Sequence, residues 1–350
     1  MKKTGALLLA LSLMVSAFVG CASGQAEPQG QTETAAQTAQ ETQSETAGEP
    51  MDVNVVAMKG PTAMGMVQFM DEADKGNVTT NNYNFSIAAS ADEVTPMIAQ
   101  GTADIAAVPA NLASVLYNNT DGGVRVLAIN TLGVLYIVET GDGIQSVADL
   151  EGKTIYASGK GSTPEYALNY VLKQNGLDPS SDVTIEWMSE QTECVAALAN
   201  SEDAIAMLPQ PFVTTAQSKN SDIRVALDLT EEWDALQENA QTPSTLCTGV
   251  VVARTEFAEE HPEVIRDFLD KYEASVAYVN ENVDAAAALV GQYDIVTEEV
   301  AKTALPECHI VCITGDEMKE KLSGYLSVLA EENAQSVGGT LPADDFYYSE

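Results

Sequence analysis

The sequence predicts an α/β fold of two lobes that are joined by two crossings of the chain. Short apolar stretches alternate with segments of helical periodicity between about residue 51 and residue 247. The connections between them are short, which is typical of βαβ units with mainly parallel sheets. After Pro262 the chain is strongly helical. Neither end of this region holds a complete sheet with covering helices, so we expect the C-terminal helices to pack on the N-terminal lobe.

The composition excludes several classes of function. The 350 residues contain 16 Lys and Arg against 52 Asp and Glu, which gives a net charge of −36. Such a surface repels phosphate backbones, so no nucleic-acid partner is expected. The apolar content of 45% indicates a real core. His261 and His309 are the only histidines, which leaves little for histidine-based catalysis or metal binding.

The first residues predict export. Lys2 and Lys3 precede the apolar run Ala6–Val19, as in a secretory signal, and this run is too short to span a bilayer. Gly20 directly before Cys21 resembles a bacterial lipobox, which implies cleavage of residues 1–20 and a lipid on the Cys21 sulfur. An ordinary secretory cleavage with an incidental cysteine is the alternative.

The segment after Cys21 predicts a tether. Residues 22–50 contain no Val, Ile, Leu, Met or aromatic side chain, so this segment cannot bury enough apolar area to order itself. We therefore interpret residues 21–50 as a lipidated cysteine followed by a disordered linker. The folded part then begins at about residue 51.

The N-terminal part of the folded region is expected to alternate strands with helices. Gly101 ends one of these helices, as glycine commonly does. The expected strands are Val53–Met58, Phe85–Ala89, Ile105–Val108 and Arg125–Asn130, with a further extended run over Leu132–Glu139, and the expected helices are Thr62–Ala73, Asp92–Gln100 and Asn111–Tyr117.

The central part forms a second series of the same kind. It opens with a strand, a glycine-rich turn and a helix that stops at Gly176. Its segments are Lys153–Ala157, Pro164–Gln174, Val183–Met188, Cys194–Ala199, Ala204–Leu208, Phe212–Ser218 and Ile223–Leu229; after them come the strand Thr248–Arg254 and the helices Pro262–Val279, Ala285–Tyr293, Glu298–Ala304 and Glu317–Glu331.

Two apolar extended runs bracket this central series. They are Val126–Val138 and Thr248–Ala253. We therefore expect the first lobe to comprise residues 51–130 and 248–350, and the second lobe residues 131–247. A linear split into two domains is the alternative.

Two glycine-containing turns are candidates for a binding site. They are Lys59–Thr62 and Gly159–Pro164, and each directly precedes a predicted helix. Glycine permits close approach to a ligand, Ser or Thr can cap the helix, and Pro fits its first turn. The free N–H groups of such a helix start, with the lysines Lys59 and Lys160, favour an anionic or polar group. Well-capped turns with solvated lysines are the alternative.

Further candidate sites follow other strands. They are Val108–Asn111, Ser189–Thr192 and Leu208–Phe212, whose Gln210 lies between two prolines. Open α/β sheets bind ligands at strand ends of this kind, and ordinary surface loops are the alternative. The aromatic residues nearby are expected in the core; they are Tyr166, Trp187 and Phe212.

Catalytic and metal sites are not indicated. Cys308, His309 and Cys312 lack the paired C-x-x-C partner of zinc sites, and no GxSxG, HExxH or GxGxxG pattern is present. We expect no metal, no cofactor and no enzymatic activity. With Cys194 and Cys247, these cysteines leave open either disulfides or buried free thiols.

Several segments together resemble a known family. They are VVAMKGPTAMGM, AQGTADIAAVPANLA, SVADLEGKTIYASGKGSTPEYAL, SEQTECVAALANSEDAIAMLPQPFVT and EFAEEHPEVIRDFLDKYEASVAYVNEN. Their order and spacing resemble the substrate-binding lipoproteins of ABC importers, in the group that binds nitrate, sulfonates, taurine and thiamine precursors. The resemblance extends over nearly all of residues 53–348. It implies a type II periplasmic-binding-protein fold with a ligand cleft between the lobes.

The resemblance also implies a function. The chain would be a lipid-anchored, monomeric receptor that captures a small polar or anionic solute, such as a sulfonate, nitrate or a pyrimidine, and delivers it to the permease subunits. The alternatives are a ligand-sensing lipoprotein and an enzyme similar to the thiamine-pyrimidine synthase, which consumes a histidine. The ligand-binding residues implied are Lys59, Gly60, Pro61, Thr62, Pro109, Ala110, Asn111, Gly161, Ser162, Thr163, Glu190 and Gln210.

Overall fold

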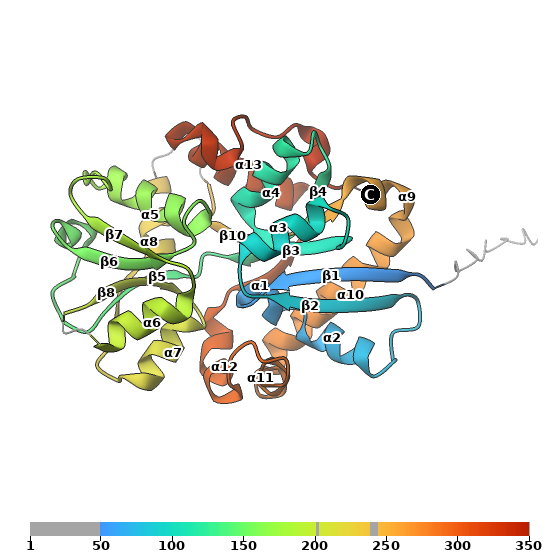
Figure 1. The fold of residues 1–350 in the computed structure, drawn as a ribbon, viewed down its shortest axis with the longest axis horizontal. Helices are drawn as coiled ribbons and strands as arrows, with labels where there is room; N and C mark the ends of the chain where they lie inside the picture. The colour runs from blue at the N-terminus through green and yellow to red at the C-terminus, as the bar shows by residue number, and fades with distance from the viewer. Residues whose placement is uncertain (1–49, 201–202, 239–243, 350) are drawn as a thin grey trace, which may run out of the picture. The chain divides into compact units, whose positions relative to one another are not determined.

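The computed structural model describes residues 50–200, 203–238 and 244–349, and it contains two sheets (Figure 1). The predicted signal peptide, Cys21 and nearly all of the linker lie outside these residues. The larger sheet holds β1 (Asp52–Met58), β2 (Asn82–Ala88), β3 (Ile105–Pro109), β4 (Val124–Leu132), β10 (Cys247–Arg254) and β11 (Ile310–Ile313), and the smaller sheet holds β5 (Leu135–Glu139), β6 (Thr154–Ser158), β7 (Thr184–Met188), β8 (Ile205–Pro209) and β9 (Arg224–Asp228).

We call the larger sheet with its helices lobe A and the smaller sheet with its helices lobe B. The strand order is β11-β4-β10-β3-β1-β2 in lobe A and β7-β6-β8-β5-β9 in lobe B. Helices lie on both faces of each sheet, so the predicted α/β fold with two lobes is confirmed. Within the described ranges, none of the helices combines the length and the apolar character needed to cross a membrane.

Both sheets are mixed. Strands β2, β1 and β3 run parallel to one another, as do β7, β6 and β8. Strand β10 is antiparallel to β3 and β4, and β5 is antiparallel to β8 and β9. The expectation of mainly parallel sheets is therefore wrong for these pairings. Strands β5 and β10 each follow a crossing between the lobes rather than a helical crossover, and parallel alignment needs such a crossover.

Alternate residues of the lobe A strands face the two layers of helices. Val250 and Val252 of β10 pack on the side of α3, α4 and α13, whereas Val251 and Ala253 pack on the side of α2 and α10. The lobe A helices are α1 (Pro61–Met64), α2 (Val67–Asp74), α3 (Ala91–Ala99), α4 (Ala110–Asn119), α9 (Thr255–Glu260), α10 (Pro262–Glu281), α11 (Val283–Gln292), α12 (Glu298–Ala304) and α13 (Gly315–Glu332).

The lobe B sheet is covered in the same way. Ile137 of β5 packs towards α5 and α8, and the neighbouring Val138 packs towards α6 and α7. These helices are α5 (Thr163–Gln174), α6 (Gln191–Asn200), α7 (Phe212–Lys219) and α8 (Leu229–Gln237). Short 3-10 helices occur elsewhere in the described chain, at Val147–Leu150 between lobe B strands and at Leu305–Glu307, Ala334–Val337 and Asp344–Phe346 in the C-terminal part.

The expected helix Thr62–Ala73 is two helices, α1 and α2, which are separated at Gly65 and Met66. The hydroxyl of Ser275 on α10 donates to the carbonyl of Gly65 at 2.7 Å and accepts the N–H of Phe69 at 3.2 Å. A Cβ at Gly65 would come within 2.9 Å of Ile310. Tertiary packing against α10 and β11 therefore accompanies the break in the apolar periodicity.

The first crossing between the lobes is short. Only Gly133 and Val134 separate β4 from β5. The carbonyl of Gly133 is hydrogen-bonded to the Nδ1 atom of His309, and a Cβ at Gly133 would overlap the Thr230 hydroxyl. His309, which no sequence pattern links to this crossing, contacts it from lobe A.

Helix α13 packs on both lobes. It lies over β4 and β10 of lobe A, and its Tyr325 also meets Trp233 of α8 with 5.5 Å between the ring centroids. At the end of α13, Glu332 pairs with Lys173 of α5 at 2.9 Å. The expectation that the C-terminal helices pack on the first lobe is thus incomplete for α13. One apolar core runs through both lobes on this side of the molecule, and it includes Leu168, Trp233, Leu246, Val250 and Tyr325.

The described cysteines are free thiols. Cys194, Cys247 and Cys308 are buried, and Cys312 is half-buried on β11. Burial raises the pKa of the Cys194 and Cys247 thiols to about 12. Of the two alternatives that the sequence left open, the structure has free thiols.

A half-buried carboxylate links α10 to the start of β2. Asp267 accepts hydrogen bonds from Thr80 at 2.8 Å, Asn81 at 3.1 Å and Tyr83 at 2.7 Å, and it pairs with Lys271. Burial raises the pKa of this carboxyl group, but the hydrogen bonds of these four partners outweigh burial and hold the pKa below its usual range.

We predict that Asp267→Asn destabilises the protein by about 1–3 kcal/mol at pH 7. Because the pKa of Asp267 is lower in the folded state, its contribution is present above the unfolded-state pKa of about 3.9 and is lost as the pH falls. Urea unfolding should therefore show a smaller difference between wild type and variant at pH 3. Asp270→Asn, at an exposed position of the same helix, is the control. An equal difference at both pH values would contradict the prediction.

Candidate functional site

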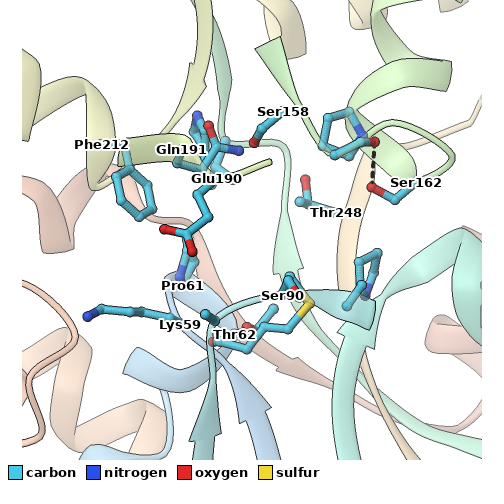
Figure 2. A pocket seen from close by; sticks show the side chains of 18 of the residues that line it. Lys59, Pro61, Thr62, Ser90, Ser158, Ser162, Glu190, Gln191, Phe212 and Thr248 are labelled. Atoms are coloured by element: carbon cyan, nitrogen blue, oxygen red, sulfur yellow. Dashed lines mark hydrogen bonds between the residues drawn. The ribbon is translucent and has the colours of Figure 1, made fainter. Parts of the chain in front are cut away.

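A cavity of about 260 Å³ lies between the two sheets, and residues of both lobes line it (Figure 2). It is built at the carboxyl ends of parallel strands. Met58 and Pro109 end β1 and β3 in lobe A, and Ser158 and Pro209 end β6 and β8 in lobe B. This is the place where open α/β sheets bind ligands. The candidate site therefore forms where the strand ends of both sheets face the same cavity.

Several helices also begin at this cavity. Ser90, Pro109 and Ser162 are the N-caps of α3, α4 and α5, while Gln191 and Phe212 are the first residues of α6 and α7. All five residues line the cavity. The first N–H groups of a helix have no partner within the helix, and the helix dipole is positive there. Together these helix starts present hydrogen-bond donors and partial positive charge to the cavity.

The cavity wall combines hydroxyl groups with apolar surface. Leu135, Val134 and Phe212 provide apolar area, together with several prolines. A wall of this kind suits a solute with a polar head and a small apolar body. The hydroxyl-bearing residues are Thr62, Ser90, Thr131, Ser158, Ser162, Ser189, Thr192 and Thr248.

Charged side chains are few. Among the lining residues, Lys59 and Glu190 are the ones that carry an ionisable group, and both are exposed. The Lys59 side chain extends away from Thr62 and Ser90 in Figure 2, so its charge lies to one side of them. Lys160 does not line the cavity. The expected pair of lysines at the site is therefore reduced to one.

The glycine turns have the predicted backbone but different hydroxyl contacts. Gly159 and Gly161 have φ angles of 84° and 77°, and Pro164 lies in the first turn of α5. The Ser162 hydroxyl does not cap the helix; it donates to the carbonyl of Gly159 at 2.7 Å. Glu165 accepts the N–H of Gly161 at 2.6 Å instead. The first turn of α5 therefore supplies its own carboxylate to the N–H group that precedes it.

The turn at Lys59 also has a hydroxyl that does not cap the following helix. Gly60 has a φ of 134° and Pro61 lies in the first turn of α1. The Thr62 hydroxyl donates to the carbonyl of Met58 at 2.8 Å rather than accepting a helix N–H. The prediction that Ser or Thr caps these two helices is wrong, because both hydroxyls bond back to the preceding strand or turn.

The structure separates the predicted site residues into two groups. Lys59, Pro61, Thr62, Pro109, Ser162 and Glu190 line the cavity. Gly60, Ala110, Asn111, Gly161, Thr163 and Gln210 do not line it.

Asn111 and Thr163 connect the lobes beside the cavity. Both are fully buried, and the Thr163 hydroxyl donates to the side-chain oxygen of Asn111 at 3.3 Å. The Asn111 amide also donates to the carbonyls of Ser336 at 3.0 Å and Gly161 at 3.4 Å. These polar groups are hydrogen-bonded within the protein, so they stabilise the elements beside the cavity instead of lining it.

Gln210 caps α7. Its side-chain oxygen accepts the N–H of Thr214 at 3.2 Å and the Thr214 hydroxyl at 3.0 Å, while its backbone N–H donates to the carbonyl of Val134. The side chain is buried. The amide that the sequence placed between two prolines as a ligand group is thus used within lobe B.

Sequence reasoning missed several lining residues. Ser158 is the last residue of β6 and Ser90 is the second residue after β2, close to the strand-end position that drew attention to Pro109. A search for hydroxyls at every strand end would have found them. Thr131 and Thr248 lie on paired strands of lobe A beside the crossings, and no local pattern identifies them. Gln191 belongs to the candidate segment Ser189–Thr192, but it was not among the predicted ligand residues.

The two histidines lie outside the cavity lining. His261 is the N-cap of α10, and it packs on Phe257. His309 contacts the crossing at Gly133.

Comparison with known proteins shows the family to which this chain belongs. The family model for the periplasmic substrate-binding protein of phosphonate ABC transporters matches residues 77–296. The chain belongs to this family. Members are binding proteins of transporters, which agrees with the resemblance inferred from the sequence. A search of curated protein sequences found no match.

Solved structures show the same fold. An ABC transporter protein from Parabacteroides distasonis has a TM-score of 0.69 at 20% identity, covering 85% of this chain and 99% of its own. The periplasmic aliphatic sulphonate-binding protein SsuA from Escherichia coli has a TM-score of 0.67 at 16% identity, covering 86% and 92%. The periplasmic nitrate-binding protein NrtA from Synechocystis has a TM-score of 0.55 at 12% identity, covering 73% and 71%. The predicted periplasmic-binding-protein fold is confirmed.

We predict that Gln210→Met lowers stability without weakening solute binding. The variant loses two hydrogen bonds at a buried helix start, which corresponds to about 1–2 kcal/mol in urea unfolding. Gln145→Met, at an exposed position outside the cavity, should leave stability within about 0.5 kcal/mol of wild type. Loss of binding with unchanged stability would instead put Gln210 in contact with the solute.

Proposed function

We propose that the protein is the lipid-anchored receptor of an ABC importer, and that it captures a small solute with a phosphonate, sulfonate or nitrate-like group in the cavity between the lobes. The observation that carries this proposal is the convergence of the starts of α3, α4, α5, α6 and α7 on one cavity lined with hydroxyls. Helix starts and hydroxyls bind oxyanions without full positive charge. Family membership and the sulphonate- and nitrate-binding structural neighbours support the same solute class.

The proposed ligand contacts come from both lobes. Thr62 and Pro109 with its helix start belong to lobe A, and Ser162 and Glu190 belong to lobe B. Lys59 is exposed beside the cavity, where its charge attracts an anion towards a protein that is otherwise strongly acidic. The cavity volume of about 260 Å³ exceeds what a four-atom anion needs, which favours phosphonates and sulfonates with an organic substituent.

The mechanism we propose is a shift between open and closed arrangements of the lobes. A solute that contacts both lobes binds the closed state better and therefore increases its population. The lobes would divide at residues 51–130 with 248–350, and 131–247. Strand membership supports this division, because lobe A strands end at Leu132 and resume at Cys247, and the lobe B strands lie between them. The closed state is the form that would deliver solute to the permease.

We further propose that a lipid on Cys21 holds the receptor at the outer face of the cell membrane as a monomer. Cys21→Ser should then move the protein from the membrane fraction to the soluble fraction, because the lipid is its only proposed anchor. Detergent phase partitioning measures this directly. Cys312→Ser, which changes a thiol of the folded part, is the control and should stay with the membrane. A Cys21→Ser protein that remains in the membrane fraction would contradict the proposal.

Solute binding is tested by thermal unfolding with ethylphosphonate, ethanesulfonate and nitrate. A ligand at one hundred times its Kd stabilises the folded state by about 2.7 kcal/mol, which should raise the Tm by a few degrees. Ser162→Ala should weaken binding by about tenfold, since it removes one hydroxyl of the cavity wall. Ser180→Ala, at an exposed position away from the cavity, is the matched control. The proposal fails if none of these solutes moves the Tm of the wild type.

A further inference from the structure

The side-chain amide of Asn111 is hydrogen-bonded to both lobes. Asn111 is the second residue of α4 in lobe A, and it is fully buried. Its nitrogen donates to the carbonyl of Ser336 in lobe A at 3.0 Å and to the carbonyl of Gly161 in lobe B at 3.4 Å. Its oxygen accepts the hydroxyl of Thr163 in lobe B at 3.3 Å. One side chain therefore connects the C-terminal segment of lobe A with the glycine turn of lobe B.

The hydroxyl of Thr163 is directed to Asn111 rather than to another neighbour. Thr163 is the first residue of α5, and it is fully buried. Tyr325 of α13 is close to it, since burial raises the pKa of Tyr325 and the Thr163 hydroxyl opposes this rise. Within the described ranges, however, no hydrogen bond satisfies the buried Tyr325 hydroxyl. A threonine hydroxyl has one proton to donate, and here Asn111 accepts it.

This pair of residues, Asn111 and Thr163, lies directly beside the cavity. Thr163 follows Ser162, and Asn111 is the second residue after Pro109. Ser162 and Pro109 line the cavity from opposite lobes, and α4 packs against α5 at this point. A movement that draws the starts of α4 and α5 apart therefore opens the cavity wall and breaks the hydrogen bonds of the pair. These bonds belong to the arrangement in which both lobes line the cavity.

Burial distinguishes the pair from the ion pair at the other end of α5. There Lys173 pairs with Glu332 at 2.9 Å, and the two side chains are 42% and 27% exposed. Ion pairs of this kind contribute little and are weakened by salt. The amide and hydroxyl of the pair are uncharged and shielded from water, so a hydrogen bond between them is not weakened by competing solvent. The pair therefore favours the closed arrangement at any ionic strength.

We propose that Asn111 and Thr163 are positioning residues that raise the population of the closed arrangement before a solute binds, and that they raise solute affinity without contacting the solute. The apparent Kd is the Kd of the closed state divided by the fraction of protein that is already closed. Loss of the pair lowers this fraction, so it weakens the binding of every solute by the same factor. This inference rests on the proposed function and adds a control of affinity that is independent of the solute.

The first test measures the distance between the lobes without any solute. Helices α3 and α6 begin at the cavity from opposite lobes, so spin labels at Asp92→Cys and Ala196→Cys move apart when the cavity opens. Both positions are exposed, and a Cys312→Ser background removes the half-buried thiol. Pulsed electron paramagnetic resonance of the full chain in detergent should show longer distances in Asn111→Leu and Thr163→Val than in the parent protein.

The second test measures affinity by calorimetric titration with ethanesulfonate and with ethylphosphonate. Asn111→Leu removes both hydrogen bonds to lobe B and should weaken binding about tenfold, whereas Thr163→Val removes one and should weaken it about threefold. Each variant should weaken both solutes by the same factor. Thr163→Ser keeps the hydroxyl and should bind as the wild type does. The double variant should bind no more weakly than Asn111→Leu, because the two residues act through one contact.

Two control variants separate this effect from a general loss of stability. The buried hydroxyl of Ser114 donates to the carbonyl of Val337 at 2.8 Å, next to Ser336 and within lobe A. Ser114→Ala should lower the Tm but leave the distance between the lobes and the affinities unchanged. Tyr325→Phe removes the hydroxyl beside Thr163 that does not hold it, and should also bind as the wild type does. Thermal unfolding verifies that each variant is folded.

The outcomes separate this inference from the proposed function. Parent-like distances and affinities in both Asn111→Leu and Thr163→Val overturn the inference. Weaker binding at unchanged distances, or of one solute only, also overturns it, because the residues would then contact the solute. The same holds if Thr163→Ser or Ser114→Ala behaves like Thr163→Val. If neither solute binds the wild type, the proposed function fails, and the distances measured without solute still show whether the pair holds the lobes together.

Discussion

The apolar core that runs through both lobes is the constraint on which the rest of the structure depends. On one side of the molecule, α13 packs against the β4–β10 pair and meets α5 and α8, so that Tyr325 and Trp233 share one environment. The lobes are therefore held together along this side as well as by the chain crossings at Gly133 and before Cys247. The movement between the lobes that we propose would open the side where this core is absent, at the cavity between the strand ends.

The cavity presents hydrogen-bond donors in a chain that is otherwise very acidic. With a net charge of −36, the protein has few cationic side chains available for a ligand, and most described lysines and arginines are paired with carboxylates. Helix starts supply donors without net charge, and hydroxyls add more. The first-turn glutamates Glu93, Glu165 and Glu193 then limit how much negative charge the site tolerates.

Much of the fold could be predicted from residue patterns. The strands at residues 52–58 and 105–109 are short apolar runs, and the helix at residues 262–281 follows a period-3.6 apolar spacing; both patterns are local. The break at Gly65 and the antiparallel course of β5 and β10 could not be predicted, because they depend on partners such as Ser275 and β8 that lie far away in the sequence. For the same reason, Gln210 looked like a ligand group although Thr214 occupies it.

The sequence by itself determined the α/β class, the alternation of elements and the turns from which Pro61, Pro109 and Ser162 reach the cavity, because these depend on local periodicity and on glycine and proline geometry. Tertiary structure alone decided which polar atoms remain without partners. Asn111 and Thr163 satisfy each other, whereas Gln191 and the bulged Thr248 do not. A hydrogen bond between residues far apart in the chain leaves no mark on local sequence, so only the folded arrangement separates a structural polar group from one that is free to bind a solute.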